Sequence, residues 1–410
     1  MDPRPGTPAP RPPAIVLGGT ANALSIARSL GRDGVTVYAI NDESSAIRHS
    51  RYIRWIPMPR KATSRDHLEY LLGPRSDPLR GSVLLAASDP GLELIARHRP
   101  ELLKRFLLDD SNPAAQLCML DKLCTYEAAM AAGIPTPRFW AVHPGTDLAA
   151  LRPGLVYPLI VKPHRSEVFE AEFGRKYFLA RSFEEVVAGA AVAAAAGIDV
   201  LLMELIEGPD DRLCSYNTYL DEGGKPVFDF TKRIIRRFPV NMGTATYHVT
   251  DHIPELREPA LALFRQVGLR GVANAEFKLD SRDGTLKLIE CNARFTASTP
   301  LLAACGFDLG RFVYDRVTGR SPAPFVPYPA GRHLWSPVDD TRAFLEMRSR
   351  GELTSRAWLR SLLRRQVFAF LDWRDPGPSV VVHARLVRAA ARKVFRRQER
   401  GSGAPPATAP

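Results

Sequence analysis

The stretch VANAEFKLDSRDGTLKLIECNARF, residues 272–295, decides the fold that this sequence predicts. Apolar and polar residues alternate on both sides of the Asp-Gly pair at 283–284. Such alternation is typical of a β-hairpin, because an Asp-Gly pair tolerates the left-handed backbone of a tight turn. The acidic residues of this stretch are therefore expected to stand on β-strands.

The register of the hairpin decides whether two carboxylates face each other. A two-residue loop places Glu276 opposite Cys291, and a three-residue loop over residues 282–284 places it opposite Glu290. Two carboxylates that face each other in a sheet repel unless something neutralises them. With Asn292 on the face of Glu290, the second register gathers three oxygen donors of the kind that Mg²⁺ prefers. A solvent-facing acidic stripe is the alternative.

Upstream of the hairpin, the sequence alternates between strands and helices. Apolar runs at 14–19 and 35–42 flank a helical stretch, and residues 83–98 repeat a strand followed by a helix. This pattern predicts βαβ units and a parallel sheet over residues 14–115. Asp89 is the expected N-cap of the helix in the 83–98 repeat.

The glycine pair at 18–19 invites a dinucleotide-binding interpretation. The sequence there is GGTANA, which lacks the GxGxxG spacing that brings the backbone close to a pyrophosphate. We therefore expect these glycines to serve helix–strand packing. A nicotinamide-dependent dehydrogenase is the corresponding functional alternative, and the missing spacing argues against it.

Composition and length bound the class of protein. The chain has 410 residues, of which 45% are apolar and 24% charged. This composition excludes a wholly disordered or collagen-like chain, and at ~100–200 residues per domain it predicts two to three domains. No apolar run reaches the ~20 residues of a membrane span. The Pro-rich residues 1–13 and the Pro/Gly/Ala residues 401–410 are expected to be disordered tails.

The five cysteines are spaced without a CxxC pair or a zinc-like pattern. We expect all of them to be reduced thiols in a cytoplasmic protein.

Two lysines and an acidic loop lie between the parallel-sheet region and the hairpin. Lys122 follows Asp121 at a predicted helix start, and Lys162 interrupts the apolar strand YPLIVKP. The strand VLLMELIEGPDD, residues 200–211, runs into an acidic loop. A lysine within an apolar strand requires an anionic or polar partner.

These features, followed by Glu-x-Asn-x-Arg at 290–294, form an ordered set that resembles the ATP-grasp superfamily. The resemblance covers residues 14–320 and is carried by DKLCTYEAAMAAGIPTP, LIVKP, MELIEGPDD, GVANAEF and IECNARFTAS. The chain looks most like the carboxylate–amine ligases that include D-aspartate ligase. The resemblance implies an α/β and α+β chain: a Rossmann-like parallel-sheet pre-ATP-grasp domain over 14–115, then a two-lobed ATP-grasp domain over 116–330.

The resemblance also implies the ligands and the site residues. Its cofactors are ATP and one or two Mg²⁺ ions, with Mn²⁺ as a substitute. Met203 to Leu205 would follow the adenine edge, Asp210 would hold the ribose, and Arg294 and Lys162 would be catalytic. The implied nucleotide contacts are Lys122, Lys162, Lys176, Met203, Glu204, Leu205, Glu207 and Asp210. The implied metal ligands are Glu276, Glu290 and Asn292.

Two stretches depart from the family pattern. The loop over residues 164–177, which would cover the phosphates, has one glycine where the family loop is rich in them. Asn274 stands where the peptide-ligase branch has an arginine, so Arg294 would act without that partner. The stretch GTATYH, residues 243–248, is expected to help line the carboxylate pocket. We expect its His248, like His252, to be a surface histidine, and a general base is the alternative for both.

The implied reaction joins a carboxylate to an amine, with ATP activating the carboxylate as an acyl phosphate. Its partners are the small-molecule carboxylate and amine, with no nucleic acid and with a homodimer as a common family assembly. One alternative is a nucleotide-binding sensor without turnover. Another is a different ATP-grasp chemistry, of the carbamoyl-phosphate or carboxylase kind.

The positive charge is concentrated in a C-terminal extension over residues 331–400. This extension holds 16 Lys/Arg and 7 Asp/Glu, or +9 of the net +12. Residues 380–400 have a basic amphipathic helical pattern. An Arg-rich helix packed on the ligase is one interpretation, and peripheral contact with the inner membrane face is a second. Contact with nucleic acid or another polyanion is the third.

Overall fold

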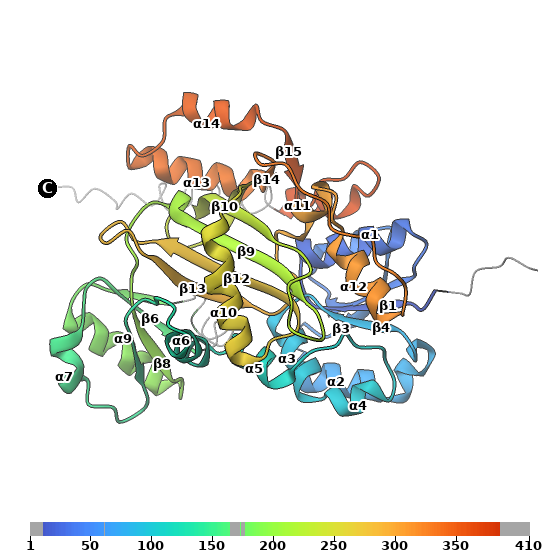
Figure 1. Cartoon of the computed structure of the whole chain (residues 1–410), viewed down its shortest axis with the longest axis horizontal. Helices are drawn as coiled ribbons and strands as arrows, with labels where there is room; N and C mark the ends of the chain where they lie inside the picture. Colours follow the sequence, from blue (N-terminus) through green and yellow to red (C-terminus); the bar gives the residue numbers. More distant parts are fainter. Residues whose placement is uncertain (1–10, 61, 165–172, 174–176, 386–410) are drawn as a thin grey trace, which may run out of the picture.

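The structure is a computed structural model that describes residues 11–60, 62–164, 173 and 177–385. Three β-sheets organise these residues. In Figure 1 the first sheet, drawn in blue, and the small green lobe lie on opposite sides of the large central sheet. No helix in the described ranges is long and apolar enough to cross a membrane.

The first sheet has four parallel strands in the order β3-β2-β1-β4, which confirms the predicted parallel sheet. The helix after β4 begins one residue earlier than expected. Ser88 is its N-cap, because its side chain accepts from the Gly91 amide, and Asp89 is the first helical residue. The predicted cap at Asp89 is therefore wrong. The elements are β1 (Ala14–Leu17), α1 (Ala21–Arg32), β2 (Val37–Asp42), β3 (Ile53–Met58), α2 (Ser64–Leu72), β4 (Val83–Ala86), α3 (Asp89–Arg97) and α4 (Arg99–Leu103).

The small lobe is an antiparallel sheet in the order β5-β8-β6-β7, covered by an Ala-rich helix. Val186, Ala190 and Ala193 of this helix pack into one apolar core with the strands. Two short helices connect the first sheet to the lobe. The elements are α5 (Pro113–Leu120), α6 (Lys122–Ala131), β5 (Phe139–Val142), α7 (Leu148–Leu151), β6 (Leu159–Pro163), β7 (Phe178–Ala180), α9 (Phe183–Ala195) and β8 (Val200–Glu204).

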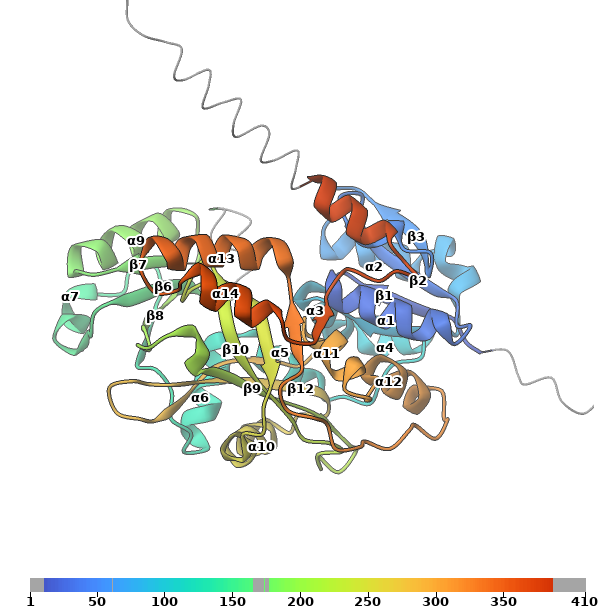
Figure 2. The ribbon, with the colours of Figure 1, turned by 90° about the horizontal axis from the view of Figure 1, so that it is seen from above.

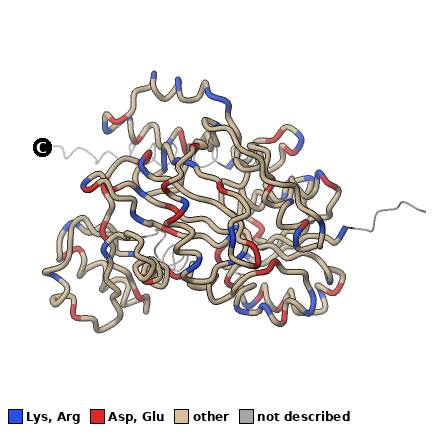
Figure 3. Tube along the Cα trace, viewed as in Figure 1, with Lys and Arg blue, Asp and Glu red and all other residues tan. Residues whose placement is uncertain are grey.

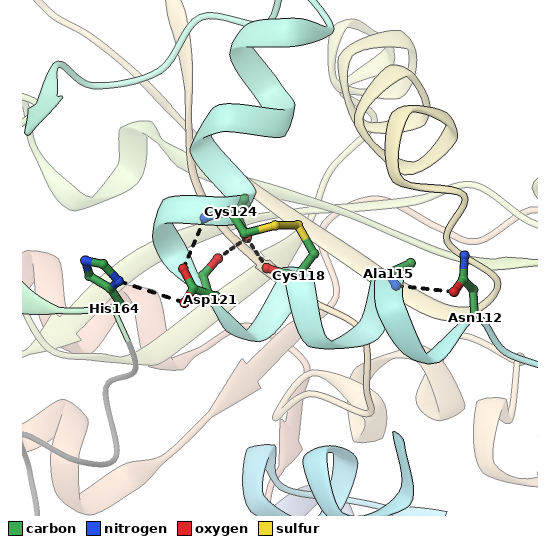
Figure 4. Close-up of a disulfide and its surroundings, with 7 residues drawn as sticks. Asn112, Ala115, Cys118, Asp121, Cys124 and His164 are labelled. Carbon is green, nitrogen blue, oxygen red and sulfur yellow. Dashed lines mark hydrogen bonds and ion pairs between the residues drawn. A yellow bond between two sulfur atoms is a disulfide. The ribbon is translucent and has the colours of Figure 1, made fainter. Parts of the chain in front are cut away.

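A disulfide joins the two connecting helices, as Figure 4 shows. Cys118 of α5 and Cys124 of α6 are bonded, with their Cα atoms 5.3 Å apart. The expectation that all five cysteines are reduced is therefore wrong for this pair, whereas the other three are free and buried. The chain turns at Asp121, which caps α6 through the Cys124 amide. This corner brings together two cysteines whose spacing alone does not indicate a bond.

Removing the disulfide should destabilise the protein without unfolding it. The cross-link joins residues at a sequence separation of 6, and closing so short a loop stabilises the folded state by about 2 kcal/mol. We expect the Cys118→Ser, Cys124→Ser double variant to lose about this free energy in urea unfolding. Reductant should destabilise the native protein and leave the variant unchanged. Five reactive thiols in the denatured, unreduced protein would contradict the bond.

The large sheet has the order β13-β12-β9-β10-β11-β14-β15 and is antiparallel except for its last pair. Helix α10 packs on one face, where Leu261 and Phe264 join the core beneath β12. The elements are β9 (Leu213–Leu220), β10 (Phe230–Phe238), β11 (Thr244–Thr250), α10 (Arg257–Val267), β12 (Gly271–Leu279), β13 (Leu286–Asn292), α11 (Thr299–Ala304), α12 (Leu309–Val317), β14 (His333–Trp335) and β15 (Gln366–Phe368).

The hairpin β12–β13 pairs Glu276 with Glu290, the register that gathers the carboxylates. The loop differs from both expected lengths. Asp280 and Thr285 close it through the bond from the Asp280 amide to the Thr285 carbonyl, and Gly284 takes the left-handed conformation at φ 70°. This loop alone would misalign the acids by one residue. A bulge just beyond Glu276 restores the alignment.

The C-terminal segment is part of the fold, because β14 and β15 extend the large sheet. Helices α13 (Pro337–Ser349) and α14 (Ser355–Leu362) lie along one side of that sheet (Figure 2). Asp340 is buried and pairs with Arg236 at 2.7 Å. Arginines occur along α14, at the top of Figure 3.

The chain then returns to the first sheet. Asp375 is buried there and accepts from Arg28 at 2.9 Å and from Ser50 at 2.7 Å. Residues 377–385 are helical, which covers the beginning of the predicted 380–400 helix. The remainder of that prediction lies outside the described residues.

Candidate active site

A cavity of about 440 Å³ lies where the three sheets meet. Helix α6 and strands β6 and β8 line it from the small lobe, β10 to β13 line it from the large sheet, and Asp89 of α3 reaches it from the first domain. Eight of the predicted site residues share this cavity. They are Lys122, Lys162, Met203, Leu205, Glu276, Glu290, Asn292 and Arg294.

The other predicted contacts lie elsewhere. Glu204 forms an ion pair with Arg282 at 2.7 Å. The Asp210 carboxylate accepts from the Arg237 guanidinium at 2.7 Å and from the Arg237 amide at 3.0 Å. These acids and Glu207 are outside the cavity lining, so their contact with a ribose stays a prediction. Lys176 lies outside the described residues.

One wall of the cavity carries the two opposed carboxylates. Lys122 Nζ lies 3.6 Å from Glu290 Oε1. Burial, together with the charge of Glu290, raises the pKa of Glu276 above its usual value. The Asn292 amide nitrogen donates to the Asn274 side chain at 3.1 Å, which leaves the Asn292 oxygen as the ligand atom.

This donor set fits Mg²⁺. Two carboxylates and an amide oxygen are the hard oxygen ligands that this ion prefers, and a bound cation would relieve the repulsion between the acids. In the described ranges no three His, Cys, Asp or Glu side chains gather into a metal site. The two acids therefore need the Asn292 oxygen, and ligands from outside the protein, to complete a coordination shell.

Lys162 is a buried cation at the centre of the small lobe's sheet, with 8% of its surface exposed. Its Nζ lies 3.4 Å from the Tyr126 hydroxyl and 5.3 Å from the centre of that ring. Burial, aided by the positive charge of Lys122, lowers the pKa of Lys162 to about 7. Two neighbouring lysines facing a cavity form a site prepared for an anion.

Two further lysines of the cavity were not singled out from the sequence. Lys232 and Lys278 line it from β10 and β12, and burial lowers the pKa of both. His248 also lines it and is 5% exposed, so the expectation of a surface histidine is wrong there. His252 is exposed as expected. Burial and the charge of Lys232 hold the pKa of His248 well below its usual value.

A sequence signal for Lys232 was available. On its face of the strand FTKRIIRRF it lies between Phe230 and Ile234, so it interrupts an apolar row there. Its neighbours in the register are Ser215 and then Glu276, so the alternation places all three on one row of the sheet. Of the GTATYH stretch, Gly243, Thr244, Ala245 and His248 line the cavity.

Arg294 is held by a residue of the first domain. Its guanidinium donates to both carboxylate oxygens of Asp89, with Nη2 at 2.9 Å from Oδ2, and its Nη1 donates to the Phe295 carbonyl at 3.2 Å. Sequence reasoning treated Asp89 as a helix cap and missed this contact. The two residues are 205 positions apart, so no local pattern connects them.

Comparison with known proteins agrees with this architecture. Residues 245–314 match the family described as carbamoyl-phosphate synthase L chain, ATP binding domain. The chain is 26% identical over 363 residues to the D-aspartate ligase of Enterococcus faecium (strain Aus0004), an alignment that covers 81% of this chain and 83% of the relative.

Two solved structures share the fold. The L-amino acid ligase from Bacillus licheniformis superimposes with a TM-score of 0.57 at 16% identity, covering 77% of this chain and 76% of that one. The N5-carboxyaminoimidazole synthetase from Staphylococcus aureus, complexed with ADP, superimposes with a TM-score of 0.58 at 17% identity, covering 77% and 79%. The fold, the matching family and the sequence relative agree in their resemblance to the ATP-grasp ligases.

Proposed function

We propose that this protein is an ADP-forming ligase that activates a carboxylate with ATP and joins it to an amine. One observation carries the proposal: a single cavity gathers four lysines, two opposed glutamates, Asn292 and Arg294. The lysines can bind phosphate oxygens and the glutamates can hold a metal ion, and phosphoryl transfer requires both kinds of group at one site. The relative from Enterococcus faecium is named as a ligase, which supports the same reaction class.

The residues of the chain have distinct tasks in this proposal. Lys122 and Lys162 bind phosphate oxygens, and nucleotide binding restores the charge that burial removes from Lys162. Met203 and Leu205 line the adenine side of the cavity. Glu276, Glu290 and Asn292 hold one or two Mg²⁺ ions, or Mn²⁺ in their place. When bound, the metal supplies charge neutralisation between the phosphates.

The reaction then needs no nucleophilic side chain. A carboxylate oxygen of the acid substrate forms a bond to the γ-phosphorus, and the bond to the ADP oxygen breaks. The amine nitrogen next attacks the acyl carbon, phosphate leaves with the bridging oxygen, and the amine loses a proton. Arg294 stabilises negative charge on the transferring phosphoryl group. Orientation of the two substrates is the main contribution of the cavity.

The domain boundaries and the setting of the protein belong to the same proposal. We divide the chain into a pre-ATP-grasp domain over 14–115, an ATP-grasp domain over 116–330 and a C-terminal extension over 331–400, whose described residues end at 385. The substrates are small molecules, and the cytoplasmic setting stays a prediction. A homodimer stays a prediction. A peripheral membrane contact through 380–400 also stays a prediction, because most of that segment lies outside the described residues.

The test is ADP release with Mg-ATP across a panel of amino acids and amine acceptors. The proposal expects turnover that requires an acid and an amine together. Phosphate should appear in equal amount to ADP, and an amide product should match both by mass spectrometry. Tight ATP binding without turnover on a broad panel would instead favour the sensor alternative. ATP hydrolysis that ignores both substrates would contradict the ligase.

A further inference from the structure

The contact between Asp89 and Arg294 joins the first domain to the cavity wall. Both oxygens of the carboxylate accept from the guanidinium, and both residues line the cavity. A guanidinium held by two parallel hydrogen bonds has its plane fixed as well as its position. The carboxylate therefore sets the direction in which the remaining N–H groups of Arg294 point.

The turn that carries Asp89 packs closely against the glycine pair at 18–19. The Ser88 side chain caps α3 through the Gly91 amide, so Asp89 is freed from capping and occupies the first turn. Ser88 lies against Gly18: a Cβ added there would come within 2.1 Å of the Ser88 hydroxyl oxygen. A Cβ on Gly19 would meet the Ala87 carbonyl oxygen at 2.6 Å. The glycine pair of the GGTANA motif thus makes room for the turn that carries Asp89.

The buried side-chain amide of Asn22 bonds to the backbone on both sides of the Asp89–Arg294 ion pair. Asn22, which is 6% exposed, donates from Nδ2 to the Ala87 carbonyl at 2.6 Å and to the Phe295 carbonyl at 3.0 Å. Ala87 precedes Asp89 by two residues, and Phe295 follows Arg294. One side chain of the GGTANA motif therefore braces both backbones that bring the ion pair together.

We infer that Asp89 is a positioning residue that orients Arg294 in the cavity. The GGTANA motif of the first domain holds the turn that carries Asp89 in place. The inference rests on the proposed function, since it assigns Asp89 to the ligation step. It gives the glycine pair a purpose beyond helix–strand packing. It also makes the first domain necessary for chemistry rather than for substrate enclosure alone.

Stability alone does not explain this arrangement. An ion pair with one partner a third exposed contributes at most ~1 kcal/mol to folding. The chain contains a similar pair away from the cavity lining, in which Arg233 Nη2 meets Asp251 Oδ2 at 2.7 Å. The carboxylate of Asp251 is 35% exposed and that of Asp89 is 33% exposed, so the two acids are matched in exposure, although Arg233 meets one carboxylate oxygen and Arg294 meets both.

The experiment compares Asp89→Ala and Asp89→Asn with the control Asp251→Asn. Misplacing a catalytic group by about 1 Å lowers turnover by up to ~10²-fold. We expect Asp89→Ala to lower kcat by about 10- to 100-fold and to leave KM for ATP within about twofold, with Asp89→Asn intermediate. Asp251→Asn should keep the kcat of the parent. In an Arg294→Ala background the Asp89 substitution should have no further effect, because the two act as one unit.

A second readout needs no turnover. Crystal structures of the parent and of Asp89→Ala with ADP should show Arg294 displaced or disordered in the variant, with α3 and β13 unchanged. An unmoved guanidinium, or equal kcat losses in the Asp89 and Asp251 variants, would overturn the inference. If no acid–amine pair supports turnover, the proposed function fails, and the two ADP-bound structures still decide whether Asp89 orients Arg294.

Discussion

Replacing Glu290 with alanine should lower ADP release by about 10²- to 10³-fold, because it removes one of the two carboxylates that would hold the metal. Glu276 stands directly opposite, and Lys122 lies 3.6 Å away, so the variant loses a metal ligand and leaves the lysine without its acid. The fold should survive, since the Glu290 carboxylate is 43% exposed.

Thermal unfolding provides the readout that separates metal binding from turnover. Mg²⁺ with ADP should raise the melting temperature of the parent and should fail to do so in Glu290→Ala. Glu258→Ala is the control, because Glu258 pairs with Arg257 at the surface and is 68% exposed. Full ligand-induced stabilisation in Glu290→Ala, with normal turnover, would remove Glu290 from the metal site.

Replacing Lys162 with methionine should weaken ATP binding by about 10²-fold, or about 2.7 kcal/mol. The lysine loses its hydration on burial and regains a favourable charge interaction when phosphates bind. Calorimetry in buffers of different ionisation enthalpy should then show proton uptake at about pH 8 in the parent, because the free pKa of about 7 must rise on binding. Lys162→Met should bind ATP without that uptake, while the exposed Lys225→Met should match the parent.

The same substitution should stabilise the folded protein, with a defined pH dependence. The folded pKa of Lys162, about 7, is below its usual value of 10.5. Between these values the unfolded chain binds more protons, so the lysine's unfavourable contribution shrinks as pH rises. Lys162→Met should therefore raise the melting temperature most at about pH 6 and least near pH 10. A variant that is less stable at low pH would contradict the buried cation.

The sequence predicted the fold well where periodicity was strong. The βαβ pattern and the hairpin around 283–284 follow from alternation and turn chemistry, and both are present. The pairing of Glu276 with Glu290 depends instead on a bulge that compensates a longer loop. No residue type in the strand signals that bulge, so the sequence left the register open.

Site residues were predictable where a charged residue interrupts an apolar strand. They were less predictable where tertiary packing sets the partner of a side chain. Lys162 was recognised on that ground, whereas Lys232 interrupts only one face of a strand that also holds three arginines, and it was missed. The local sequence around Asp210 and Asp89 does not indicate their ion-pair partners. These partners are Arg237 and Arg294, which stand on other elements of the fold. Contacts of this kind depend on how elements pack in three dimensions, which local pattern does not encode.

The central claim is that a substrate carboxylate takes the phosphoryl group inside this cavity. An acid substrate labelled with oxygen-18 in its carboxylate tests it most directly, with the released phosphate analysed by mass spectrometry. The account predicts that one labelled oxygen appears in each phosphate, because the bridging oxygen leaves with phosphorus when the amine attacks. Unlabelled phosphate from a reaction that still forms the amide would contradict the acyl phosphate and the mechanism built on it.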